Sequence, residues 1–184
     1  MAVREHVASR IDQWEALGKI SPKTAERYRE LLKNQIAPNL GSVLLQKLRG
    51  ADIERWHATL KIGGLSARTI GHAHRLLSKA LKEGLRHELV VRNVATTEQP
   101  PKPEDQEVAI LGAGDVKLVV EKLRGRAIYP IAIMALFTGL RRGELLALRW
   151  SDVEEKIVHV RRAVEETKAG LRLKVPKTKK ASAM

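Results

Sequence analysis

One short stretch holds side chains whose types and spacing suit the binding of a phosphate. Residues 137–153 read FTGLRRGELLALRWSDV, with Glu144 three residues after Arg141. Residues three apart lie on one face of a helix, so the carboxylate is expected to brace the guanidinium. A guanidinium held in this way presents two parallel N–H donors to phosphate oxygens. An ordinary amphipathic helix with an exposed Arg–Glu pair accounts for the same spacing.

The charge of the chain indicates a polyanionic partner. The 184 residues include 34 Lys and Arg against 21 Asp and Glu, which gives a formal net charge of +13. Nucleic acid is the first partner that such a charge suggests, and an anionic membrane is the second. No apolar run is long enough to span a bilayer, and neither end predicts a helix with one basic and one strongly apolar face. Duplex DNA is therefore favoured and a membrane partner is not.

The rare residue types narrow the choice further. Only 3% of the residues are aromatic, whereas proteins that stack splayed bases need more, so RNA and single strands are disfavoured. The sequence has no cysteine, which excludes disulfides and thiolate metal sites and suits a cytoplasmic protein. The six histidines lack a metal-binding spacing and are expected at the surface or the edge of the core. We predict no metal and no cofactor.

Two helices in the first half are expected to carry basic faces. Ser21 before Pro22, and Ser66 after a pair of glycines, are residue types that begin helices. A solvated surface explains either basic stripe alone, but two stripes in so basic a chain favour phosphate contacts, with Thr and His near phosphates or base edges. The predicted DNA-binding residues are Lys23, Thr24, Arg27, Arg68, Thr69, His72 and Arg75.

Apolar spacing and helix-breaking residues divide the chain into two domains. Residues 1–95 are predicted to form a four-helix domain. Three prolines among polar residues predict a semi-rigid linker over residues 96–107, and residues 108–184 form the second domain. The four helices are expected at residues 3–18, from Ser21 to Ile36 with Pro38 and Gly41 closing it, between Gly50 and Gly63, and at 67–87 with Leu85 facing inward.

The second domain is predicted to be α+β, in a chain that is mainly α. Helices are expected over residues 115–123 and 129–137, followed by the helix of the arginine motif. Residues 157–161 and 171–175 alternate in polarity and are predicted to pair as a short antiparallel hairpin, with Gly170 in the turn region. The carboxylates of Glu154, Glu155, Glu165 and Glu166 are expected to be solvated, with no acid–base role.

Several stretches resemble the tyrosine recombinases, the phage integrase family. SPKTAERYRELLKNQIAPNLG and GGLSARTIGHAHRLLSKALKEGLRHELVVRNVA are similar to the family's core-binding domain. ILGAGDVKLVVEKL resembles the opening helix of its catalytic domain, and TGLRRGELLALRWSDV closely resembles its first catalytic-arginine motif. The resemblance implies a helical, SAM-like core-binding domain followed by a truncated α+β catalytic domain. The hairpin ending in PKTKKAS looks like the strands that lead to the family's catalytic lysine.

The resemblance also implies roles for single residues. In this family a tyrosine attacks a DNA phosphodiester, forms a 3′-phosphotyrosine and releases a 5′-hydroxyl. Arg141 matches the arginine that binds the non-bridging oxygens of the scissile phosphate, and Glu144 matches the carboxylate that orients the site. Lys177 matches the lysine that protonates the leaving oxygen, with Lys179 and Lys180 as alternatives. Fixed cations stabilise such a reaction without a metal.

The family's other catalytic residues have no match here. Its His-x-x-Arg, its second His or Trp and its nucleophilic tyrosine would lie beyond Met184, while Tyr28 and Tyr129 fit core or core-edge positions. The resemblance thus implies the amino-terminal part of an integrase, either a natural truncation or an expressed fragment. We expect it to cleave no DNA strand alone.

The predicted function is the DNA-binding part of a site-specific tyrosine recombinase. The alternative is a non-enzymatic DNA-binding regulator or competitor derived from a truncated integrase, and a structural module would leave the charge unexplained. Self-association is a further expectation, because an incomplete second domain leaves apolar surface partly exposed or covered by another copy. That surface is expected near Ile133, Leu136, Leu145 and Leu148.

Overall fold

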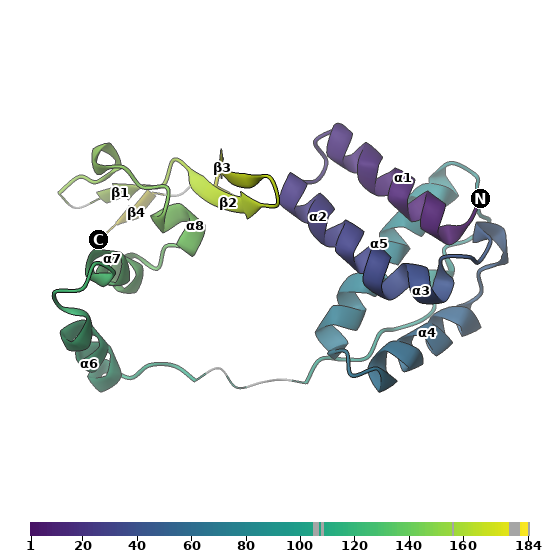
Figure 1. Cartoon of the computed structure of the whole chain (residues 1–184), viewed down its shortest axis with the longest axis horizontal. Coiled ribbons are helices and arrows are strands. Elements are labelled where there is room, and N and C mark those ends of the chain that lie inside the picture. Colours follow the sequence, from purple (N-terminus) through teal and green to yellow (C-terminus); the bar gives the residue numbers. More distant parts are fainter. Residues whose placement is uncertain (105–106, 108, 156, 177–180, 184) are drawn as a thin grey trace. The chain divides into compact units, whose positions relative to one another are not determined.

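The computed structural model describes residues 1–104, 107, 109–155, 157–176 and 181–183. The chain divides into two compact units, Met1–Gln106 and Glu107–Met184. Figure 1 shows helices throughout the first unit, and helices with short strands in the second. This mainly α architecture with a short antiparallel hairpin confirms the predicted fold class.

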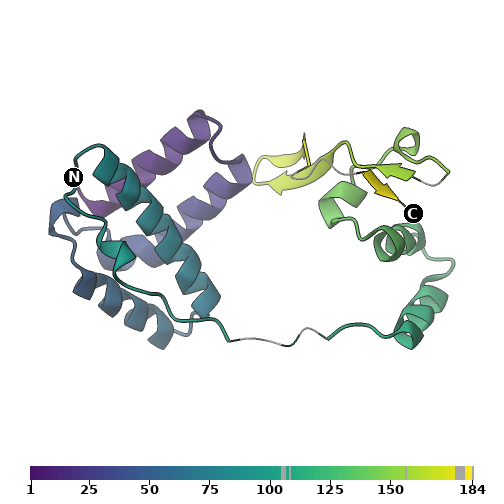
Figure 2. The same ribbon diagram turned by 180° about the vertical axis from the view of Figure 1, so that it is seen from behind.

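The first unit is a helical bundle. Its helices are α1 (Val3–Ala16), α2 (Pro22–Leu31), a π-helical segment (Leu32–Ile36), α3 (Ala37–Leu40), α4 (Gly50–Ile62) and α5 (Ala67–Arg86), with 3-10 turns at Leu45–Lys47 and Val94–Thr96. The long α5 contacts α1, α2 and α4, and Figure 2 shows it crossing the bundle. α5 is therefore the element that fixes the others relative to one another.

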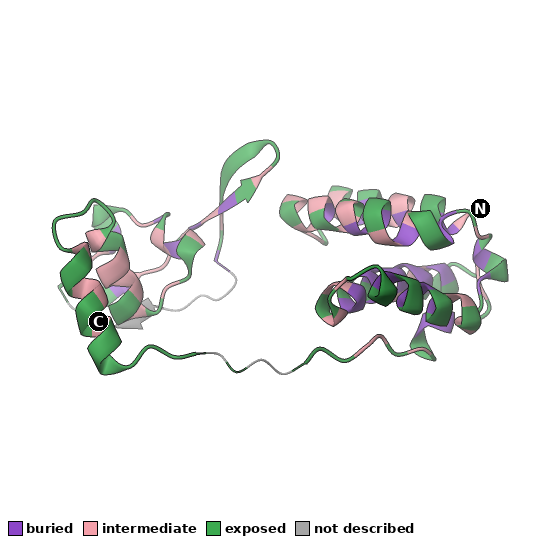
Figure 3. Cartoon of the chain, turned by 60° about the horizontal axis from the view of Figure 1, so that its bottom comes forward, coloured by how far each residue is buried: buried purple, intermediate pink, exposed green. Residues whose placement is uncertain are grey.

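A single apolar cluster holds this bundle together. Figure 3 shows its buried residues on the sides of the helices that face one another. Each large apolar side chain contributes about 1.5–3 kcal/mol by leaving water. The fully buried members include Val3, Val7, Ile11, Ile70, Leu77 and Leu81. The inward position predicted for Leu85 is wrong, because each step of four residues along a helix turns the side chain by about 40° and Leu85 is exposed.

Pro38 does not close the second helix. The chain passes from α2 through the π-helical segment into α3, where Pro38 is the second residue. The first turn of a helix tolerates proline because its N–H would have no partner there. The Gln35 carbonyl in the π-helical segment accepts the Trp56 indole N–H at 2.8 Å and the Asn39 amide N–H at 3.2 Å. Side chains thus anchor the irregular segment to α4 and α3.

The second unit combines short helices and two strand pairs. Its elements are α6 (Ala113–Leu123), α7 (Tyr129–Thr138), α8 (Arg142–Leu145), a 3-10 turn (Trp150–Asp152), β1 (Ile157–His159), β2 (Ala163–Thr167), β3 (Gly170–Lys174) and β4 (Ala181–Ala183). β2 pairs with β3 and β1 pairs with β4, both antiparallel. The predicted pairing of residues 157–161 with 171–175 is therefore wrong. The tight turn before Gly170, whose φ is 113°, joins β3 to the nearer strand.

The helices of the second unit bury little apolar surface. Neither α6 nor α7 has a buried residue, and Phe137 is 71% and Trp150 94% exposed. Leu136 is exposed, while Ile133, Leu145 and Leu148 are half-buried, so the predicted partial exposure is confirmed. Among the described residues, no helix has the length and apolar character needed to cross a membrane.

Three histidines are buried in the first unit, against the surface or core-edge positions expected for them. The Nε2 atom of His6 lies 2.9 Å from the Ala80 carbonyl oxygen, and the Nε2 atom of His57 lies 3.1 Å from Nδ1 of His74. Removal from water disfavours the charged form and lowers the pKa of each of the three rings. The three buried rings are therefore uncharged at pH 7.

Acid should destabilise the first unit through these histidines. Below about pH 6.5 the unfolded chain binds protons that the folded rings bind only at lower pH, so the stability present above pH 6.5 falls as the pH falls. Urea unfolding between pH 7.5 and 5.5 should show this loss, and His74→Gln should flatten it. His87→Gln, which replaces an exposed histidine, should leave it unchanged; a free energy of unfolding that is constant over this range contradicts the prediction.

Candidate nucleic-acid interface

Two helix starts in the first unit are built alike. The Ser21 Oγ atom accepts the backbone N–H of Thr24 at 3.3 Å, and the Ser66 Oγ atom accepts that of Thr69 at 3.2 Å. In each pair the two hydroxyl oxygens also lie within hydrogen-bond distance, at 3.1 and 3.0 Å. These caps fix the first turns of α2 and α5, whose N-termini carry partial positive charge.

Three arginines gather around His72. The Nη2 atom of Arg75 donates a hydrogen bond to His72 Nδ1 at 2.9 Å. Desolvation, followed by the positive charges of Arg75, Arg27 and Arg68, lowers the pKa of His72. Arg27 lies on α2 and the others on α5, so the packing of these helices brings the two predicted basic stripes together. All four side chains are exposed.

Acidic neighbours on α2 only partly offset this charge. Lys23 Nζ lies 3.7 Å from Glu26 Oε2, and Arg27 Nη1 lies 3.4 Å from Glu30 Oε2. Exposed pairs of this spacing contribute about 0.2–0.5 kcal/mol, so a phosphate can replace them. All seven predicted DNA-binding residues lie on α2 and α5. Four of them form the cluster of three arginines around His72. The other three, Lys23, Thr24 and Thr69, lie in the first turns of the two helices.

The arginine motif forms the start of α8 in the second unit. Gly139, with φ of 63°, ends α7, and Arg141 is the N-cap of α8. Glu144 Oε2 accepts the backbone N–H of Arg141 at 3.0 Å, and Oε1 accepts its side-chain Nη1 at 3.2 Å. Glu144 is buried, whereas 70% of the Arg141 side-chain area is exposed. The structure thus contains the predicted contact, while the catalytic roles of both residues stay predictions.

Gly143 lets α8 lie directly on β2, and the sequence alone did not single it out. A Cβ atom on Gly143 would lie 2.5 Å from the carbonyl oxygen of Val164, closer than real atoms approach. A larger residue would push α8 away from the strand. Glycine inside a helical pattern can signal such a close approach of backbone. The contact fixes the helix that begins after Arg141.

Asp152 ties the end of the motif to the chain after β1. Its Oδ2 atom accepts the Arg149 backbone N–H at 3.0 Å and a hydrogen bond from Arg162, and Oδ1 lies 3.4 Å from Arg161 Nη1. Desolvation favours a higher pKa for this carboxyl, but the Arg149 N–H and the two arginines outweigh it and lower the pKa. Asp152 is therefore a charged, buried clamp.

Glu165 is buried, contrary to the solvated position expected for it. It forms an ion pair with Lys174 across the hairpin. Successive residues of a strand point to opposite faces, so Glu165 is covered while the adjacent Glu166 is exposed. The pair places a cation beside the buried carboxylate on the hairpin whose backbone supports α8.

Part of the predicted catalytic set falls outside the described residues. This applies to Lys177 and to its alternatives Lys179 and Lys180. Within the ranges that the structure describes, no group of three or more His, Cys, Asp or Glu side chains is arranged to hold a metal ion.

Comparisons with known proteins agree with this architecture. Residues 8–61 match the family described as phage integrase, N-terminal SAM-like domain. This part of the first unit is therefore similar to the amino-terminal SAM-like domain of phage integrases. It is 30% identical over 154 residues to an integrase of Streptomyces ambofaciens, covering 80% of this chain and 38% of that protein. It is 26% identical over 147 residues to a XerC-like tyrosine recombinase of Caldanaerobacter subterraneus, covering 76% and 37%.

Solved integrase structures share the fold. The Tn1549 transposon integrase in complex with circular intermediate DNA matches with a TM-score of 0.83 and 20% identity, covering all of this chain and 61% of that one. A lambda integrase dimer bound to a core site matches with a TM-score of 0.75 and 19% identity, covering all of this chain and 62% of that one. The predicted resemblance to tyrosine recombinases is confirmed, and the chain spans less than half the length of the curated integrases above.

Gly143→Ala tests the contact between α8 and β2. The added Cβ would meet the Val164 carbonyl, so the second unit should lose about 1–3 kcal/mol of stability. Gly114→Ala is the matched control, because nothing lies within 4 Å of its Cβ and alanine favours a helix. Hydrogen exchange of peptides from α8 and β2, measured by mass spectrometry, should quicken only in the first variant. Equal exchange in both variants contradicts the contact.

Proposed function

We propose that this chain is the DNA-binding part of a site-specific tyrosine recombinase, with duplex DNA as its partner. The observation that carries the proposal is the exposed cluster of Arg27, Arg68 and Arg75 around His72, in a unit that contains the integrase SAM-like domain. Clustered guanidinium groups bind phosphates and release counterions, which drives association with DNA. The integrases of the same fold were solved in complex with circular intermediate DNA or bound to a core site, which supports DNA as the partner.

Different residue types on α2 and α5 have different roles in DNA binding. Their arginines and Lys23 contact phosphates and set the position of the protein on the duplex. Thr24 and Thr69 offer hydroxyls at helix starts that already favour anions. The lowered pKa keeps His72 neutral, so Nδ1 accepts the hydrogen bond from Arg75 and the Nε2–H group can donate one to a base edge or phosphate.

Arg141 binds the scissile phosphate in this proposal. Its guanidinium is exposed, while the buried Glu144 holds both its backbone and its side chain. Phosphoryl transfer depends on positioning and charge stabilisation, and one fixed donor contributes about 10²–10³ in rate. Glu144 thereby orients the site, and Lys177 donates the proton to the leaving 5′-oxygen.

The organisation of the chain follows the same proposal. Residues 1–95 bind DNA, residues 96–107 link the domains, and residues 108–184 belong to the catalytic domain. The exposed apolar surface of α7 supports self-association, and lambda integrase has been solved as a tetramer on a Holliday junction. We place the protein in the cytoplasm, where DNA is accessible. A non-enzymatic regulator is not favoured, because the relatives are named integrases or a recombinase.

The triple variant Arg27→Ala, Arg68→Ala, Arg75→Ala tests the cluster. Loss of three phosphate contacts should weaken duplex binding and reduce the slope of log K against log salt by about 2.7 in magnitude. Fluorescence anisotropy with a labelled duplex at several salt concentrations measures both. The control Arg4→Ala, Arg55→Ala, Arg86→Ala removes the same charge from exposed positions outside the cluster. Equal changes in the two variants would show that net charge, and not this surface, binds DNA.

Substitutions of Arg141 and of Glu144 should differ in their effects on DNA affinity and on the stability of the protein. Arg141→Ala should weaken duplex binding with little loss of stability, since most of the side chain is exposed, and Arg141→Lys should restore only part of the affinity. Glu144→Ala should also lower the free energy of unfolding by about 1–3 kcal/mol, because the Arg141 N–H loses its acceptor. Anisotropy and urea unfolding measure the two effects. Unaltered DNA affinity in Arg141→Ala would exclude the phosphate role.

A further inference from the structure

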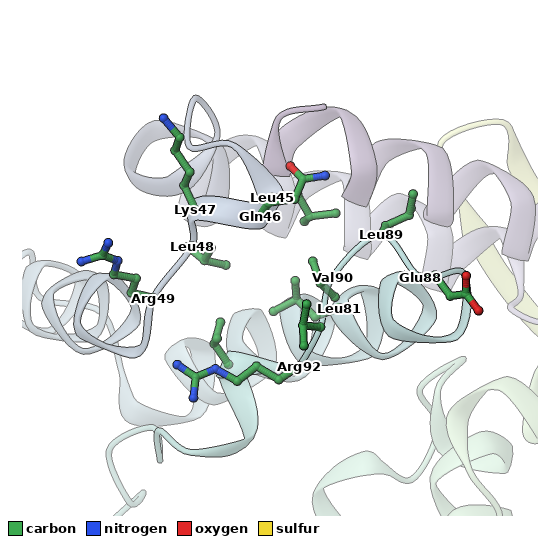
Figure 4. A pocket seen from close by; sticks show the side chains of 12 residues that line it. Leu45, Gln46, Lys47, Leu48, Arg49, Leu81, Glu88, Leu89, Val90 and Arg92 are labelled. Carbon is green, nitrogen blue, oxygen red and sulfur yellow. The ribbon is translucent and has the colours of Figure 1, made fainter.

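A pocket of the first unit faces away from the arginine cluster around His72. It has a volume of about 580 Å³, and Leu81 of α5 lies at its floor. Leu81 follows His72 by nine residues, and a turn of about 100° per residue directs the two side chains to opposite sides of the helix. Figure 4 shows the side chains around the opening, which belong to the segments Leu45–Arg49 and Glu88–Arg92, with Leu81 and Val94.

The floor of this pocket is apolar. Leu45, Leu48, Leu81 and Val94 line it and are buried in the core beneath the opening. Val91 lines the same pocket with 98% of its surface exposed. The volume falls within the range of about 300–1,000 Å³ that is usual for binding pockets. An occupant must therefore offer apolar groups to the floor.

The rim of the pocket is positively charged at one end. Figure 4 shows Lys47, Arg49 and Arg92 toward this end and Glu88 at the other. All four side chains are exposed, so three cations and one carboxylate give the rim a net charge of about +2 at neutral pH. Among the residues that the structure describes, none of the three cations forms an ion pair, whereas Arg29 pairs with two carboxylates. The three cations are therefore open to an acidic partner.

Glu88 has a backbone conformation that glutamate rarely adopts. Its φ is 56°, and it follows the end of α5, where the N–H of Leu89 donates to the Gly84 carbonyl at 2.9 Å. A glycine would end the helix in the same way without backbone strain. Strained residues of this kind cluster at sites that clamp a ligand. The glutamate places a carboxylate at the end of the pocket opposite to the cations.

An acidic and apolar peptide matches these features better than DNA does. Duplex DNA offers phosphates to the cations but keeps its bases stacked inside, so it has no apolar group for the floor. A peptide with carboxylates, then leucine-like side chains, then a cation matches the rim cations, the floor and Glu88 in turn. Burial of the apolar side chains supplies affinity, and the charge pairs set the direction of the peptide.

We propose that this pocket docks a segment of another protein in which carboxylates, apolar side chains and a cation follow one another. The carboxylates pair with Lys47, Arg49 and Arg92, the apolar side chains cover the floor, and the cation pairs with Glu88. This docking uses none of the predicted DNA-binding residues. The partner and a DNA duplex therefore bind the chain at the same time.

A peptide titration tests the docking site. The probe is the fluorescein-labelled peptide Asp-Glu-Leu-Leu-Ala-Leu-Leu-Lys, titrated with the full chain at physiological salt. It should bind saturably with a Kd of about 10–100 µM, as expected for a short segment that loses entropy on binding. Arg49→Glu with Arg92→Glu should raise this Kd at least about tenfold. The control Arg4→Glu with Lys82→Glu makes the same charge change at exposed positions that do not line the pocket, and should leave Kd unchanged.

Changes in the peptide test the floor and the direction of binding. A peptide with serine in place of every leucine should bind at least about tenfold more weakly, because apolar burial supplies part of the affinity. Glutamine in place of the terminal lysine should weaken binding to the unaltered chain about threefold, as expected for one exposed ion pair. The same change should have no effect with Glu88→Gly, which keeps the end of α5 but lacks the carboxylate.

Competition and sedimentation separate this partner from other occupants. A saturating unlabelled duplex should leave the Kd of the peptide unchanged. The proposal fails if no saturable binding occurs, if both charge-reversal pairs act equally, or if the serine peptide binds as well as the leucine peptide. It also fails if the glutamine peptide loses affinity equally for both proteins. Displacement of the peptide by the duplex would assign the pocket to DNA, and self-association that only Arg49→Glu with Arg92→Glu abolishes would assign it to a second copy.

Discussion

The proposed phosphate site depends on one carboxylate, Glu144, whose two oxygens both bind Arg141. A buried carboxylate must be satisfied, and here the backbone and side chain of one residue satisfy it. α8 has only four residues and cannot be stable alone, so its position comes from its neighbours. Gly143 seats it on β2, and Asp152 clamps the chain that follows. An exposed guanidinium is thereby held by buried contacts.

In the first unit, too, buried contacts hold exposed guanidinium groups in place, here three of them. Arg27, Arg68 and Arg75 repel one another, and a loose chain would separate them. The apolar cluster between α1, α2 and α5 holds the helices that carry them, and the serine caps fix where α2 and α5 begin. Packing energy thus maintains a concentration of like charge that favours a polyanion. Each unit, taken by itself, presents cations that its own interior holds in place.

The sequence predicted most of the features that depend on residues close together in the chain. The helices α1, α2, α4 and α5 follow from apolar spacing and from Ser21 and Ser66, and the Arg141–Glu144 contact follows from a three-residue interval. Features set by distant parts of the chain were missed. The partner of β3 was chosen by turn geometry, and the burial of Glu165 depends on Lys174 across the hairpin. Gly143 matters only because Val164 approaches it, which one sequence does not reveal.

Replacement of single DNA phosphates by neutral methylphosphonates tests most directly whether Arg141 grips a phosphate. Binding of the unaltered chain and of Arg141→Ala would be compared across a series of such duplexes. If Arg141 binds a phosphate, one replacement should weaken binding of the unaltered chain about tenfold and have no further effect on the variant, as expected for a lost charge-assisted hydrogen bond. If every replacement weakens both proteins equally, Arg141 does not contact a phosphate and the proposed site is wrong.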